Sequence, residues 1–109
     1  MIRATTPTHI FTFPTEVNPA DCAKIQVTYA QEIKSKYCPG AEQVILEKNK
    51  SDLTIDGQKA TLELTQNDMN LFKEGSAQIQ IRAKDSSGEV MASQIFNVKV
   101  KKVLNQEVL

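Results

Sequence analysis

The 109-residue chain is predicted to be an all-β protein, an antiparallel β-sandwich of about seven strands with one short helical crossover around 66–72. Two observations carry this prediction. Apolar and polar residues alternate along most of the chain, as in strands with one buried face. Turn-forming residues recur between the alternating segments, and the sequence has no long stretch with the 3.6-residue helical period. We expect one domain over 1–109, with a short tail from about 104.

The first half of the chain is expected to hold four strands. They are predicted at 9–13, 24–30, 43–47 and, more weakly, 51–55. In the first of them, Phe11 and Phe13 share one face, which His9 also shares by alternation. Residues 31–41 are predicted to form a long loop, because they are rich in lysine and contain Pro39-Gly40.

The second half begins with a hairpin signal at Asp56-Gly57, since a tight hairpin turn favours residues that accept positive φ. Thr65 and Asp68 resemble a capping box, which predicts one or two helical turns, and Gly75 can end them. Strands are predicted at 59–65, 77–84 and 90–103, with turn residues at 85–88. The last strand is long enough to be bent or bulged.

Composition excludes several classes of function. Lys+Arg and Asp+Glu are equal at 13 each, and this zero net charge argues against a nucleic-acid binder. His9 is the single histidine, and neither cysteine is expected to meet it as a catalytic pair. Phosphate-binding, dinucleotide and zinc-protease motifs are missing from the sequence. We therefore expect no enzyme, no cofactor and no metal site.

The cellular setting is expected to be a reducing cytoplasm. The N-terminal segment MIRATTPTHIFTFPTEV has no apolar core of a secretory signal, and no apolar run is long enough to span a membrane. Cys22 and Cys38 are therefore expected to be free thiols. The protein is therefore expected to stay in a cytoplasm, or to be assembled there into something larger.

The register of the last hairpin suggests an apolar outward face. If Lys84 pairs with Glu89, then Met91 and Ile95 point outward, and Ile45 joins them if Val44 and Leu46 are core. Three apolar groups on one solvent face would form an interaction surface. The alternatives are scattered surface residues, or a bulge at Gly88 that reverses the register.

Two further candidates lie outside that face. Lys99, Lys101 and Lys102 could contact an acidic partner, or could protect an exposed strand from aggregation. Tyr37, in the predicted 31–41 loop, is the one aromatic residue that suits a ligand loop.

Spacing in the second half resembles the last part of an immunoglobulin-like domain. Leu62-x-Leu64, a crossover at 65–75 and Ile79-x-Ile81 carry this resemblance. The chain departs from the immunoglobulin pattern in having no cysteine pair across the sheets and no tryptophan. Binding in immunity or adhesion does not follow from it.

Phrases such as TPTHIFTF and VKKVLNQEVL, with KIQVTYAQ, resemble small proteins encoded in phages and prophages of Gram-positive gut bacteria. The resemblance covers nearly the whole chain, except for the longer segment 32–41. A looser similarity links them to the immunoglobulin-like N-terminal module of phage baseplate upper proteins. The resemblance implies a structural or adaptor protein of a tail or baseplate, with other tail proteins or itself as partner. Its implied location is the host bacterial cytoplasm during assembly, or the virion. The alternative is a small ligand- or carbohydrate-binding module.

Overall fold

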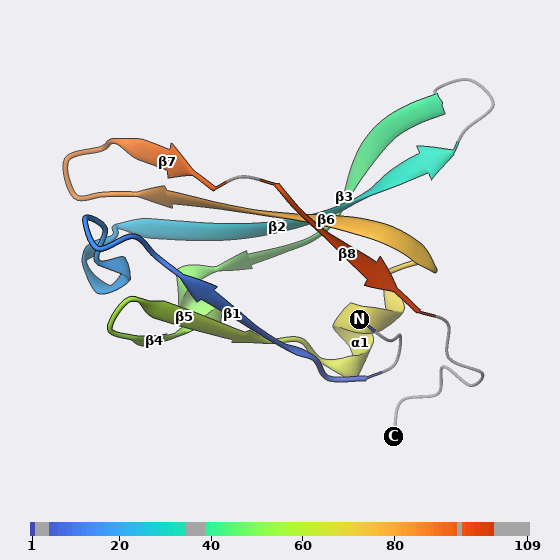
Figure 1. Ribbon diagram of the computed structural model, residues 1–109, viewed down its shortest axis with the longest axis horizontal. Coiled ribbons are helices and arrows are strands. Elements are labelled where there is room, and N and C mark those ends of the chain that lie inside the picture. Colours follow the sequence, from blue (N-terminus) through green and yellow to red (C-terminus); the bar gives the residue numbers. More distant parts are fainter. Residues whose placement is uncertain (2–4, 35–38, 94, 102–109) are drawn as a thin grey trace.

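The computed structural model describes residues 1, 5–34, 39–93 and 95–101. These residues form eight strands, one α-helix and two 3₁₀ turns (Figure 1). The strands are β1 (Thr8–Thr12), β2 (Lys24–Lys34), β3 (Pro39–Asn49), β4 (Thr54–Asp56), β5 (Lys59–Glu63), β6 (Gly75–Lys84), β7 (Val90–Ala92) and β8 (Phe96–Val100). The helix α1 spans Gln66–Asn70, and the 3₁₀ turns η1 and η2 span Pro19–Asp21 and Lys50–Asp52.

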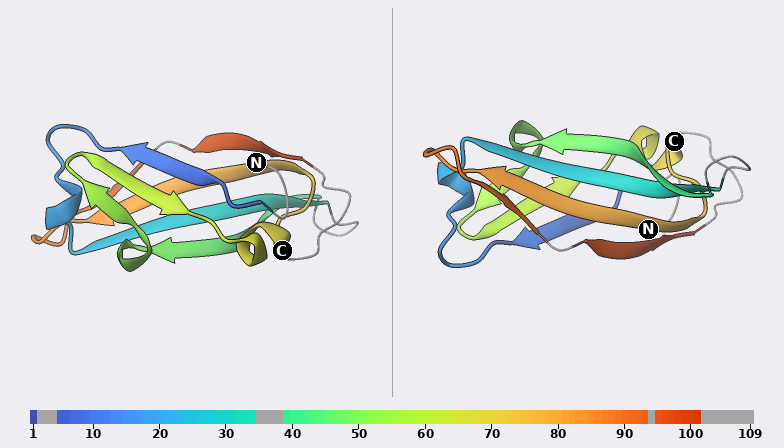
Figure 2. Two further views of the ribbon diagram at one scale, coloured as in Figure 1. Left: turned by 90° about the horizontal axis from the view of Figure 1, so that it is seen from below. Right: turned by 90° about the horizontal axis from the view of Figure 1, so that it is seen from above.

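The strands form two antiparallel sheets packed face to face. The smaller sheet has the order β1-β5-β4. The larger has the order β3-β2-β6, and both β7 and β8 pair with β6 on its other side. In both views of Figure 2, β1 and β8 lie along one side of the molecule and β3 along the opposite side. The predicted antiparallel sandwich with one helical crossover is confirmed.

The core lies between the two sheets and follows the predicted alternation. Ile25, Val27 and Tyr29 of β2 are fully buried, while the residues between them are half-buried. Phe72, just after α1, packs its ring edge-on against Tyr29, with centroids 5.7 Å apart. The short helix and the residues just after it thus close one end of the core, where Met69 and Phe72 are buried.

The helix begins as predicted. Thr65 Oγ1 accepts a hydrogen bond from the Asp68 backbone N–H at 3.1 Å, and Asp68 Oδ2 accepts one from the Thr65 N–H at 3.0 Å. Gly75 does not end the helix. It has φ of +131° and is the first residue of β6 instead.

The Asp56-Gly57 hairpin is confirmed with a shift of one position, because Asp56 pairs with Lys59 and Gly57 (φ +58°) begins the turn.

The predicted loop at 31–41 is wrong. β2 continues to Lys34 and β3 begins at Pro39, so that the two strands form a long hairpin.

Gln31 shows how a polar residue stays in a buried strand position. Its side-chain Nε2 donates to the Lys73 carbonyl at 2.8 Å, and its Oε1 accepts from the Lys73 N–H at 2.9 Å. This two-way pairing replaces the hydration that the buried amide loses.

The register expected for the last hairpin is also wrong, by one residue. Lys84 pairs with Val90 and Ala83 with Met91. The turn explains the shift, because Gly88 adopts φ of +94° and the Asp85 N–H bonds to the Glu89 carbonyl at 3.0 Å. A type I turn followed by a left-handed residue is a common three-residue hairpin loop. Of the alternatives considered from the sequence, a bulge at Gly88 that reverses the register is therefore the one that the structure shows.

The predicted last strand is bent, as its length suggested. It divides into β7 and β8, which pair with opposite ends of β6. At the break, Ser93 N–H donates to the Ile81 carbonyl at 2.8 Å, and Ser93 Oγ accepts from the Ile81 N–H at 3.0 Å. The hydroxyl thus takes the place of a strand carbonyl, which keeps the interrupted edge attached to β6.

Candidate interaction groove

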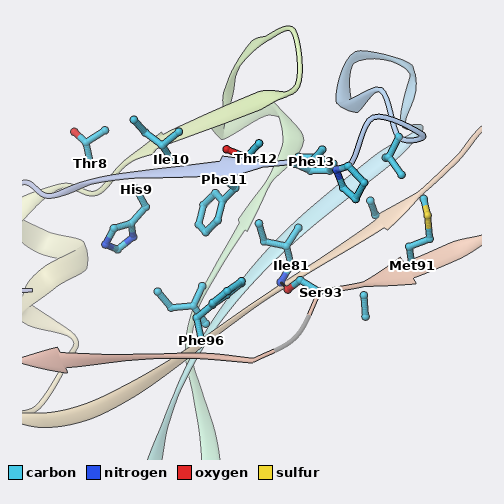
Figure 3. A pocket seen from close by; sticks show the side chains of 15 residues that line it. Thr8, His9, Ile10, Phe11, Thr12, Phe13, Ile81, Met91, Ser93 and Phe96 are labelled. Carbon is cyan, nitrogen blue, oxygen red and sulfur yellow. Dashed lines mark hydrogen bonds between the residues drawn. The ribbon is translucent and has the colours of Figure 1, made fainter.

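An apolar groove runs along one side of the sandwich, between β1 and the β6–β8 part of the larger sheet. We call it the groove; it has a volume of about 610 Å³. Its walls include the following residues: His9, Phe11, Phe13, Ile81, Met91 and Phe96. In Figure 3 the side chains of His9 and Phe11 point into the groove from β1, while Thr8 and Ile10 point away from it.

Alternation in the short strand β1 aims its aromatic side chains at the groove. Thr8, Ile10 and Thr12 are exposed, whereas His9 and Phe11 are half-buried. This confirms that His9 shares a face with Phe11. The opposite wall includes small residues, among them Ala83 and Ala92, which leave space in front of the β1 aromatics. These small side chains leave part of the space between the two sheets unfilled at this side.

The bend between β7 and β8 exposes apolar side chains next to the groove. Phe96 lines the groove and is 45% exposed. Val90 is 58% and Ile95 is 52% exposed on the same discontinuous edge, but neither lines the groove, and Val90 alternates with Met91, which does. An apolar groove with a partly exposed aromatic side chain in its lining is typical of an interaction surface.

The polar chemistry of the groove centres on His9. Its Nδ1 lies 2.7 Å from the Tyr29 hydroxyl, and the His9 tautomer decides which of the two donates. The two rings also stack, with centroids 5.7 Å apart. Burial, and then repulsion from the N-terminal ammonium, lowers the pKa of His9, while burial raises that of Tyr29. Both groups are thus held neutral near pH 7.

The other candidate reactive groups lie away from His9. Cys22 is a free thiol that is only 3% exposed, and its Sγ contacts the Asn18 carbonyl at 3.5 Å. Burial raises the pKa of this thiol, which disfavours the reactive thiolate. Cys38 lies outside the described residues. Among the residues described, no group of His, Cys, Asp and Glu side chains could hold a metal ion.

The structure separates the three apolar residues that were expected to share an outward face. Met91 is half-buried and lines the groove, because the turn at Gly88 shifts its pairing to Ala83. Ile95 is exposed, as expected. Ile45 packs against the core, because a bulge pairs Tyr29 with Leu46 and Ala30 with Val44 and leaves Ile45 as the extra residue.

That bulge also corrects the expectation for the neighbours of Ile45. Val44 is 52% exposed instead of core, while Leu46 packs against the core as expected.

The lysine cluster lies at the end of β8. Lys99 and Lys101 are exposed, and Val98 and Val100, which alternate with them, face inward. The N-terminus lies against this edge. The Met1 ammonium donates to the Lys99 carbonyl at 2.6 Å, and the Lys101 N–H donates to the Met1 carbonyl at 2.7 Å. Lys102 and Tyr37 lie outside the described residues.

Phe96 lines the groove and is exposed, and the sequence pattern did not identify it as a surface residue. Its exposure depends on the bend after Ala92, and the signal for the correct register was Gly88, which follows three other turn residues. No helix in the described part of the chain is long and apolar enough to cross a membrane. Comparisons with protein-family models, curated proteins and solved structures gave no match for this chain.

Proposed function

We propose that this protein is a non-enzymatic structural or adaptor module that acts through protein–protein contacts on the open side of its sandwich. The observation that carries the proposal is the groove of about 610 Å³, whose apolar lining includes the partly exposed Phe96. Apolar area of this kind favours burial against a partner, because its removal from water is favourable.

The occupied polar groups around the groove support a binding role over a catalytic one. His9 and Tyr29 are bonded to each other, and Ser93 Oγ accepts from the Ile81 N–H. Each of these side chains therefore has a structural partner.

We extend the proposal to a phage tail or baseplate as the assembly, with other tail proteins as partners. The resemblance of the segments 6–13 and 100–109 to phage and prophage proteins supports this extension. A zero net charge is compatible with it, since low self-repulsion favours close packing in an assembly.

Co-expression with the products of the adjacent genes tests the proposal. We expect the tagged chain to co-purify with one of them as a complex of defined stoichiometry. Phe96→Lys should abolish the complex, because it places a charge in the apolar surface. Val44→Lys is the matched control, since Val44 is 52% exposed on β3, at the opposite edge of the sheet. A complex that survives Phe96→Lys, or that is lost equally with Val44→Lys, would contradict the proposal.

A small apolar ligand is the second candidate. The volume of the groove lies within the range of about 300–1,000 Å³ that is usual for ligand pockets. Saturable binding of a fluorescent apolar probe at one site per chain, lost in Met91→Asp, would favour this candidate. Glycan binding that is lost in Tyr37→Ala would favour a carbohydrate instead.

A further inference from the structure

The sheet orders explain why the sandwich is open. An immunoglobulin-like sandwich pairs strands A-B-E-D in one sheet and the C′-C-F-G strands in the other. Here the order β1-β5-β4 corresponds to B-E-D, and β3-β2-β6 with β7 and β8 corresponds to C′-C-F and a divided G. In the described part of the chain, no strand takes the position of A beside β1. The groove lies on that side.

The backbone of β1 presents a row of hydrogen-bonding groups to this vacant position. At the two ends of the β1–β5 pairing, Leu64 N–H bonds to the Pro7 carbonyl at 3.0 Å and Phe13 N–H bonds to the Gln58 carbonyl at 2.7 Å. In an antiparallel ladder, alternate residues bond the same neighbour. The odd-numbered residues therefore face β5, and the N–H and C=O groups of Thr8, Ile10 and Thr12 face the open edge.

The other strand edges carry features that discourage pairing. β3 has the charged Glu47 and Lys48 and two register irregularities, and β4 has only three residues. β7 is equally short, and the backbone of β8 is bonded by Met1 beside Lys99. Short edges, charges, bulges and covering segments all discourage edge-to-edge association.

The side chains of β1 differ from these edges. The segment Thr8–Thr12 has no acidic or lysine side chain, its histidine is held neutral, and Ile10 at its centre is 62% exposed on the outer face. An uncharged, β-prone edge with an apolar centre is the type of edge that accepts a further strand.

We propose that β1 pairs in antiparallel fashion with β1 of a second copy of this chain, about a two-fold axis at Ile10. This inference rests on the proposed function and names one partner for the open side. Thr8 then lies opposite Thr12 of the second copy, and the two Ile10 side chains lie opposite each other. The three backbone positions that face the open edge bond one another across the axis. On the inner face, His9 lies opposite Phe11.

The self-complementary side-chain pattern argues for a second copy over a foreign strand. A two-fold interface brings each residue against its symmetry mate, so a charged edge would place like charges together. The outward-facing residues of this segment, Thr8, Ile10 and Thr12, are instead uncharged, polar at both ends and apolar at the centre, and they read the same in both directions. The two smaller sheets would thereby form one continuous sheet, with the two grooves side by side.

Light scattering after size exclusion, with amide hydrogen exchange, tests this inference. We expect a mass of twice the 12.1 kDa chain at high protein concentration, and slow exchange of the Thr8, Ile10 and Thr12 amides only in the dimer. Ile10→Lys should give a monomer, because it places two ammonium groups together at the axis. Ile10→Pro should also give a monomer, since the amide that it removes faces away from β5.

Val44→Lys is the control variant and should stay dimeric, and circular dichroism checks that each variant is folded. A wild-type monomer at every concentration would overturn the inference, as would a dimer that persists in folded Ile10→Lys. These outcomes leave the proposed function standing if Phe96 is still needed for a complex with an adjacent gene product. If that product alone protects the β1 amides, the occupant of the vacant position is a foreign strand and the second-copy inference is wrong.

Discussion

His9 Nδ1 lies 2.7 Å from the hydroxyl oxygen of Tyr29, and this hydrogen bond joins the two sheets across the interior of the sandwich. His9 belongs to β1 and Tyr29 to β2, so the contact ties the edge of the smaller sheet to the centre of the larger one. The contact therefore sets the position of β1 relative to the core.

The first prediction concerns pH. Because burial lowers the pKa of His9 from its usual 6.5, the unfolded chain binds a proton more readily than the folded one. The stability that neutral His9 contributes is fully present above about pH 6.5 and is lost as the pH falls below that value. Urea denaturation at a series of pH values should show a falling free energy of unfolding between pH 7 and 5.

His9→Gln is the matched variant for this experiment, since it keeps a polar side chain but does not titrate. We expect its free energy of unfolding to be nearly flat over the same interval. The lowered pKa values of Asp68 and Asp85 act further down, below their usual 3.8. The same slope in His9→Gln would show that another group causes the dependence.

The second prediction concerns the buried amide of Gln31. Gln31→Leu removes both hydrogen bonds to the Lys73 backbone and leaves that N–H and carbonyl without their partner. We expect a loss of about 2 kcal/mol in the free energy of unfolding. Gln43→Leu, at an exposed position of β3, is the control and should cost little. An equal loss in this variant would contradict the role given to the Gln31 hydrogen bonds.

The third prediction concerns the turn at Gly88. Nothing lies within 4 Å of a Cβ built at this position, so Gly88→Ala introduces no clash. Its φ of +94° still disfavours any residue with a side chain, and we expect a loss of about 1–2 kcal/mol. Thermal unfolding measures the loss, with the exposed Ser86→Ala as comparison. Unchanged stability in Gly88→Ala would mean that the turn adopts another conformation.

The fourth prediction concerns the start of α1. Thr65→Ala removes the hydroxyl that accepts from the Asp68 N–H, and we expect it to cost about 1 kcal/mol. Asn67→Ala, at an exposed position of the same helix, should cost nothing, because alanine is the better helix former. The two variants, compared by urea denaturation, separate loss of the cap from loss of a helical side chain. Equal effects would mean that the cap contributes nothing.

Local signals in the sequence were sufficient for much of the fold. Thr65 and Asp68 lie three positions apart and meet within one helical turn, so their pairing depends on nearby residues alone. Alternation along β6 likewise reports one buried face. Such features are predictable because the physical cause and its effect lie in the same short segment.

Features set by distant contacts were not predictable in this way. Gln31 lies in a strand because the Lys73 backbone satisfies its amide, and these residues are far apart in the sequence. A slip of one residue reverses every side chain of a strand, so a single bulge at Ile45 and one turn at Gly88 misdirected the expected surface. Whether this side of the sandwich is open depends on whether a further strand lies beside β1. No local pattern in the sequence indicates this.

The position of β1 in its sheet also has a consequence for the folding rate. β1 pairs with β5, from which it is separated in the chain by β2, β3 and β4, and β2 must wait for β6 before both its edges are paired. Folds dominated by such distant pairings close large loops before they gain contacts, and they fold in about milliseconds to seconds. During synthesis, the aromatic side chains of β1 emerge before β5 and remain without their sheet until β5 has left the ribosome.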